Sequence, residues 1–145
     1  MTSWRDTASA AAQKDLDGLL NLVLPQAQEL LGKNGRFYPF GASVSTDGEA
    51  SLTASDEGLG EHPQPEQVLA GVYDGARASA RENRAFAFVS DVLIDGGDAV
   101  QVELEHRDGI AIVVWVPYKP ATRNRVPTFR DMSVTPGEPR VWTDS

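Results

Sequence analysis

Residues 84–118, RAFAFVSDVLIDGGDAVQVELEHRDGIAIVVWVPY, decide the fold of this chain of 145 residues. Three apolar runs are separated by DGGD and by DG, and both separators are typical of tight turns between strands. Valine, isoleucine and phenylalanine dominate the runs, and these residues favour strands. The stretch therefore predicts three consecutive antiparallel strands, at residues 84–94, 99–107 and 110–118.

Two helices and a hairpin are predicted upstream of these strands. Apolar residues recur at helical spacing over residues 9–33, and Pro25 should kink or split this helix. Residues 38–55 alternate in polarity about an Asp-Gly turn, which predicts a hairpin. Residues 65–82 carry a second helical stripe. The order helix-strand-strand-helix-strand-strand-strand indicates the α+β class, with a five-stranded, mostly antiparallel sheet and an irregular C-terminal tail.

The C-terminal segment differs in character from the rest of the chain. Residues 119–145 contain four prolines, and five basic residues against three acidic ones, although the whole chain has a net charge of -8. Prolines interrupt regular structure, and a basic segment is attracted to an acidic body. We therefore expect a single α+β domain at residues 1–118 and a Pro-rich basic tail at residues 119–145, packed on the domain or trailing from it.

Composition narrows the class of function. The net charge of -8 disfavours nucleic acid as a partner, because its phosphates are bound by Lys and Arg. The absence of cysteine excludes disulfides, thiolate metal ligands and a cysteine nucleophile. Residues 1–13 lack the apolar region of a signal peptide, and no stretch approaches the roughly 18 apolar residues of a membrane span. We expect a cytoplasmic protein with no cofactor and no membrane partner.

The turn at residues 108–109 sets how the last two strands face each other. With a two-residue turn, one face would pair Ile112 and Val114 with glutamates of the neighbouring strand. This apolar pair should not stay bare, so we expect a cover from the first helix, from the tail tipped by residues 140–142, or from another subunit. The opposite face is then the predicted core, made of Val100, Val102, Leu104, Ala111, Val113 and Trp115.

The strand at residues 85–94 is apolar on both of its sides. At the edge of a sheet such a strand would be an exposed apolar edge, which natural proteins avoid. Pairing with its symmetry mate would cover it, so the sequence predicts a homodimer. The predicted dimer interface consists of Phe86, Phe88, Val89 and Val92.

Four stretches resemble a family of small uncharacterised bacterial proteins, across most of residues 30–143. The stretches are GRFYPFGASVSTDGE, HPQPEQVLAGVYDGAR, VELEHRDGIAIVVWVPYK and GEPRVW, and FYPFG and LEHRDG are their most distinctive elements. The resemblance implies no activity. The element order is also similar to roadblock and profilin-like domains, in which a five-stranded antiparallel sheet lies between helices and roadblock domains dimerise by joining sheets. This chain departs from that pattern because prolines follow its last strand where a closing helix would stand.

Few residues could carry catalysis or bind a metal. A zinc site needs three or four ligands, and the residues to consider are His62, Glu103, Glu105 and His106. Strand alternation points both glutamates away from His106, so we expect no metal site. The two glutamates could instead serve as acid and base, or form ion pairs with Lys119 or the tail arginines.

Asp91 lies in the middle of an apolar strand. A buried carboxylate is costly, so a functional role is one interpretation. A hydrogen bond to the backbone, or access to solvent at the end of the sheet, is the other.

The stretch GRFYPFGASV, residues 35–44, gathers aromatic side chains around one proline. Phe37, Tyr38 and Phe40 either anchor the hairpin to the first helix or line a binding groove together with Tyr118. The complete set of candidate binding residues is Phe37, Tyr38, Phe40, Asp91, Glu103, Glu105, His106 and Tyr118.

The leading hypothesis is a non-enzymatic protein-interaction module that forms a homodimer, with a further protein as a second kind of partner. The alternative is a small-molecule-binding protein or small hydrolase that uses Asp91, Glu103 and His106. An enzyme should bring at least two of these groups together in one pocket, whereas a module should scatter them. A third hypothesis is an acidic immunity or antitoxin protein that masks a basic toxin. The sequence assigns no catalytic residue.

Overall fold

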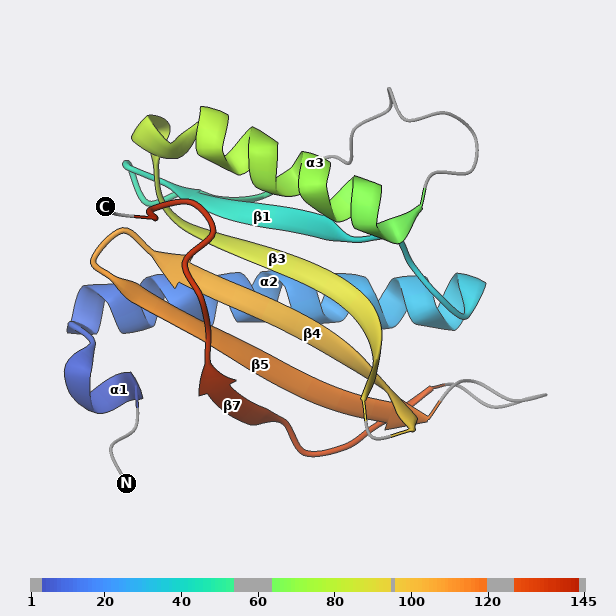
Figure 1. The fold of residues 1–145 in the computed structure, drawn as a ribbon. Coiled ribbons are helices and arrows are strands. Elements are labelled where there is room, and N and C mark those ends of the chain that lie inside the picture. The colour runs from blue at the N-terminus through green and yellow to red at the C-terminus, as the bar shows by residue number, and fades with distance from the viewer. Residues whose placement is uncertain (1–3, 54–63, 95, 120–126, 144–145) are drawn as a thin grey trace.

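The computed structural model describes residues 4–53, 64–94, 96–119 and 127–143 (Figure 1). One antiparallel sheet has a long helix on one face and a shorter helix on the other, which confirms the predicted α+β class. The helices are α1 (Trp4–Thr7), α2 (Ala10–Asn34), α3 (Pro65–Ala78) and a 3-10 turn (Ala80–Glu82). The strands are β1 (Phe40–Ser45), β2 (Ala50–Thr53), β3 (Asn83–Ile94), β4 (Gly97–His106), β5 (Ile110–Lys119), β6 (Thr128–Phe129) and β7 (Ser133–Pro136).

The sheet has the order β2-β1-β3-β4-β5-β6, and β7 also pairs with β5. The described residues therefore form seven strands, and the predicted number of five was wrong. Both additional strands lie in the tail, where prolines had indicated irregular structure. Pro136 is the last residue of β7, on the outer side of the sheet, where a missing backbone N–H costs no ladder hydrogen bond.

Helix α2 runs the length of the sheet as one element. The Ser9 side chain accepts a hydrogen bond from the backbone N–H of Ala12, and Gly35 ends the helix with φ 74°. The helix continues through Pro25, so the predicted split does not occur there. Pro25 is exposed, and its ring therefore points away from the sheet. The residues of α2 that are buried are Ala12, Asp15, Leu16, Leu19, Val23, Ala27 and Leu31.

Helix α3 packs on the opposite face of the sheet, over β1 and β3. It begins at Pro65, and Gln64 and Gln67 form a reciprocal capping box there. A Cβ atom on Gly41 would lie 2.9 Å from Cγ1 of Val72 and 2.8 Å from Oγ1 of Thr53. The close approach of α3 to β1 therefore depends on the absence of a side chain at Gly41.

The turn between β4 and β5 has three residues, and the predicted two-residue turn was wrong. His106 pairs with Ile110, the N–H of Gly109 donates to the carbonyl of His106 at 3.0 Å, and Gly109 has φ 95°. This arrangement is typical of a type I turn followed by a left-handed glycine. One additional turn residue reverses which face of β5 meets each face of β4.

The corrected register changes the composition of both faces. Ile112 pairs with Leu104 and Val114 with Val102, so these side chains share the core under α2. Of the three covers considered for Ile112 and Val114, the first helix is the one observed. The predicted core set was therefore wrong in its β5 half. The glutamates of β4 now lie opposite Val113 and Ala111, on the face that carries α3.

Strand β3 lies between β1 and β4, and its backbone from Asn83 to Val89 pairs with β1 while Ala85–Ile94 pair with β4. The premise of an edge strand was therefore wrong for residues 85–89, and the homodimer stays a prediction. Phe86 and Phe88 are buried on the α3 face, and Val89 is buried in the core under α2. Val92 is half-buried.

Candidate functional site

An open groove lies where α2 ends and the hairpin begins, and we refer to it as the aromatic groove. Its volume is about 800 Å³. Five of its lining residues belong to the stretch at residues 35–44 that the sequence singled out. The lining residues are Gln26, Leu30, Asn34, Arg36, Phe37, Tyr38, Pro39, Phe40, Leu52, Thr53 and Pro65.

Both interpretations of the aromatic stretch hold for different residues. Phe40 is buried in the core under α2, and Phe37 packs edge-on against it with ring centroids 5.6 Å apart. These two rings anchor the hairpin to the helix. Tyr38 is 48% exposed and lines the groove from its open side. Phe37, Tyr38 and Phe40 therefore form a wall with a fixed base and an accessible rim.

Asp91 fixes the position of this wall rather than lining it. Its carboxylate accepts a hydrogen bond from the hydroxyl of Tyr118 at 2.6 Å and another from the backbone N–H of Phe37. Burial raises the pKa of Asp91 and the charge of Asp98 raises it further, whereas the two hydrogen bonds oppose the shift. Tyr118 also packs on Phe129 of β6 and does not line the groove. The predicted groove shared with Tyr118 was wrong in this respect.

The groove borders an exposed edge of the sheet. Within the described residues β2 pairs only with β1, and all four of its residues are exposed. Leu52, which lines the groove, is 43% exposed. Every second residue of an edge strand directs its backbone N–H and C=O away from the sheet. The groove and this edge together offer apolar contacts beside unpaired backbone groups.

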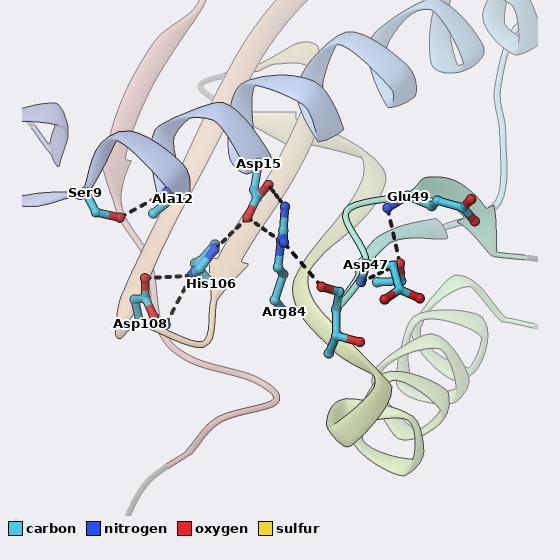
Figure 2. Close-up of polar contacts among 10 residues, drawn as sticks. Ser9, Ala12, Asp15, Asp47, Glu49, Arg84, His106 and Asp108 are labelled. Atoms are coloured by element: carbon cyan, nitrogen blue, oxygen red, sulfur yellow. Dashed lines mark hydrogen bonds and ion pairs between the residues drawn. The ribbon is translucent and has the colours of Figure 1, made fainter.

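A second polar site, at the opposite end of α2, contains the predicted residue His106 (Figure 2). His106 is 3% exposed, and its Nε2 lies 2.9 Å from Oδ2 of Asp15. Arg84 donates to both oxygens of Asp15, from Nε and from Nη2, each at 2.9 Å. This bidentate pair joins the first part of α2 to the start of β3.

Two hydrogen bonds define the proton positions on His106. The backbone N–H of Asp108 donates to Nδ1 at 3.1 Å, so Nδ1 is an acceptor and Nε2 carries the proton donated to Asp15. Burial raises the pKa of Asp15, but the hydrogen bonds from Arg84 and His106 and the positive charge of Arg84 outweigh it, so the pKa lies below its usual value. Both ring nitrogens are engaged in holding the fold together, which leaves His106 no free nitrogen to act as a general base.

Glu103 and Glu105 hold the C-terminal segment on the α3 face. Glu105 is 3% exposed and accepts hydrogen bonds from three successive backbone N–H groups, those of Arg140, Val141 and Trp142. Glu103 accepts a hydrogen bond from the Tyr73 hydroxyl and others from the Arg140 guanidinium. The ion-pair interpretation thus applies, with a tail arginine as partner.

The three groups of the hydrolase hypothesis lie apart. Asp91 is six residues along β3 from Ala85, the partner of His106, which places the two roughly 20 Å apart. Glu103 points to the opposite face of the sheet. His62 lies outside the described residues. Within those residues, no three His, Asp or Glu side chains gather closely enough to hold a metal ion, and no helix is both long and apolar enough to cross a bilayer.

Sequence reasoning missed several residues of these sites. Asp15 follows Ala12 by three positions and precedes Leu16 and Leu19 on the buried stripe of α2, and a carboxylate within an apolar stripe is a signal that could have been used. Its partner Arg84 gives no such signal. Leu30 and Leu52 in the groove carried no distinguishing pattern.

Comparisons with protein-family models, with curated proteins and with solved structures found no match to this chain. The function is therefore inferred from the geometry of its sites.

Proposed function

We propose that this chain is a non-enzymatic protein-interaction module whose aromatic groove and β2 edge bind an extended segment of a partner protein. The observation that carries this proposal is an apolar groove beside an exposed sheet edge. An added strand would form backbone hydrogen bonds with β2, and its alternate side chains would enter the groove. Backbone pairing supplies affinity in this mode of recognition, and the groove supplies specificity.

The charge of the groove indicates the chemistry of the segment. Arg36 is exposed, and the structure shows no ion pair for it within the described residues. Apolar and aromatic side chains make up most of the remaining wall. The matching segment carries an aromatic or branched aliphatic residue for the groove and an acidic residue close to it for Arg36.

The small-molecule alternative has some support from the groove, because about 800 Å³ falls within the usual range for ligand sites, roughly 300 to 1,000 Å³. The adjacent edge of β2, which has no outer partner strand among the described residues, favours a peptide, since a small ligand has no use for a row of backbone donors and acceptors. The hydrolase alternative has less support, because Asp91, Glu103 and His106 are separated and each is engaged in a structural contact.

A peptide library displayed against the whole chain tests the proposal. Selected peptides should carry an apolar residue next to an acidic one, and Tyr38→Ala or Arg36→Glu should weaken their binding at least tenfold. Leu93→Ala is the matched control, because Leu93 is 76% exposed and lies outside the groove. Binders that tolerate both groove substitutions, or a library that yields no binder, would contradict the proposal.

A further inference from the structure

A different surface carries an inference that does not depend on the aromatic groove. Residues 138–142, which we call the strap, follow β7 and cross the sheet toward α3 (Figure 1). The strap lies over Phe86 of β3, whose ring is 5.4 Å from that of Trp142. The surface beneath it combines two buried carboxylates of β4 with aromatic side chains of β3 and α3.

The contacts of the strap are those of a bound peptide. The carboxylate of Glu105 accepts hydrogen bonds from three successive backbone N–H groups at 2.6, 3.0 and 2.9 Å, which requires the main chain to bend at Arg140 and Val141 so that these groups converge on one anion. The carbonyl of Arg140 accepts from Nε of Arg77 at 2.7 Å. The main chain of the strap is therefore held from both the sheet and α3.

Side-chain contacts add sequence preference to these backbone hydrogen bonds. Nε and Nη2 of Arg140 both lie 3.1 Å from one oxygen of Glu103, and its guanidinium lies 5.4 Å from the centre of the Tyr73 ring. Trp142 covers Phe86. Arg140 and Trp142 are the two positions that this surface selects, through charge at the first and aromatic packing at the second.

We infer that the α3 face is a binding site for Arg-Val-Trp segments, filled in cis by the strap, and that a second copy of this chain can fill it in trans. The copy carries the same complementary segment, so its fit is already visible in the cis contacts. Reciprocal exchange about a two-fold axis would give a homodimer without pairing of β3. The chain stays paired with β5 as far as Gly137, whose N–H donates to the carbonyl of Ala111 at 3.0 Å, so the exchanged segment would begin at Glu138.

In a monomer whose own strap fills the site, the strap competes with any free peptide for the α3 face. An intramolecular segment of this kind acts at an effective concentration on the order of millimolar. A free peptide should therefore bind the natural chain poorly. Weakening the strap without altering the site should reveal the site.

The first experiment uses the full chain with Arg140→Ala and Trp142→Ala, and a fluorescent peptide of residues 137–143, GEPRVWT. The double variant should bind this peptide at least tenfold more tightly than the natural chain does. Adding Glu105→Gln should abolish the gain, and circular dichroism checks that each variant is folded. Equal binding by the double variant and the natural chain would contradict the proposal that the α3 face is a peptide-binding site.

The second experiment mixes two complementary full-length variants. One is the double variant with an intact site, and the other carries Glu103→Gln and Glu105→Gln with an intact strap. An equimolar mixture should give a mixed dimer by native mass spectrometry, while each variant alone stays monomeric. If the peptide binds but no mixed dimer forms, the inference that a second copy occupies the site is wrong. If the glutamine variant does not fold, the peptide titration alone still tests whether the site exists.

Discussion

The two faces of the sheet are closed in different ways. Helix α2 covers one face with a continuous apolar stripe, and the polar groups there are confined to clusters near the two ends of the helix. On the other face, α3 packs over β1 and β3, and the carboxylates of β4 are covered by the strap and by Tyr73 of α3. Water is excluded from the first face by packed apolar side chains. On the second face, the strap that covers the sheet is held by hydrogen bonds to buried carboxylates. The difference teaches that the first face supplies stability and that the second can open locally.

The largest effect is expected from a cavity under α2. Leu19→Ala should lower the free energy of unfolding by about 3 to 4 kcal/mol, because Leu19 is fully buried in the main core. Urea denaturation followed by circular dichroism measures this change. Leu93→Ala, at an exposed position, should stay within about 0.5 kcal/mol. Similar losses at the two positions would contradict the assignment of the core.

Asp15→Asn should be the next most destabilising change, by about 2 to 3 kcal/mol at neutral pH, because it leaves Arg84 and His106 without their carboxylate. The folded pKa of Asp15 lies below its usual value. The stability that the ionised Asp15 carboxylate contributes is therefore fully present above roughly pH 4 to 5, and it is lost as pH falls through the folded pKa. Denaturation across this range should show the natural chain and the variant converging toward low pH. A gap independent of pH would contradict the role of the charge.

Gly41→Ala tests the close packing of α3 on β1. The new methyl group would crowd Val72 and Thr53, so we expect a loss of about 1 to 2 kcal/mol from displacement of α3. Gly75→Ala is the matched control, because a Cβ atom there would meet nothing within 4 Å. Gly75 lies inside a helix, so this control should be neutral or slightly stabilising. Equal effects of the two changes would argue against close packing at Gly41.

Asp91→Asn should have the smallest effect and the opposite sign to Asp15→Asn. Burial raises the pKa of Asp91, so its ionised form disfavours folding at neutral pH. An asparagine oxygen can still accept from Tyr118, and we expect a gain of less than about 1 kcal/mol. This advantage should shrink as pH falls and the natural carboxylate becomes protonated. A destabilised Asp91→Asn variant would show that the charge itself holds the aromatic wall.

Helices α2 and α3 and the first five strands were predictable because each has a regular pattern, whereas α1 was not predicted. Leu16, Leu19 and Val23 mark a helical face, and the turns at Asp47-Gly48 and Asp108-Gly109 mark two hairpins. The length of the second turn was not predictable from its residues. Since strand faces alternate, that single residue decided whether Ile112 and Val114, or Ala111 and Val113, share a face with Glu103 and Glu105.

The candidate sites were predicted only in part. Tyr38 and its aromatic neighbours were found through their composition, whereas Leu52 and Leu30 join them only through the folded shape of the groove. Strands β6 and β7 were not predicted because Pro127 directly precedes β6 and Pro136 ends β7, and both prolines indicated irregular structure. The strap contacts depend on the register of β4 and β5, and so could not be placed while that register was wrong.

Hydrogen exchange at the amides of residues 140–142 tests the contrast between the faces most directly. In the natural chain these amides should be protected, but they should open at a lower free energy than the amides of β3 and β4. Glu105→Gln should speed their exchange at least tenfold, while exchange in β3 and α2 stays unchanged. Protection at residues 140–142 that persists in Glu105→Gln, or that is lost together with protection in α2, would contradict the account.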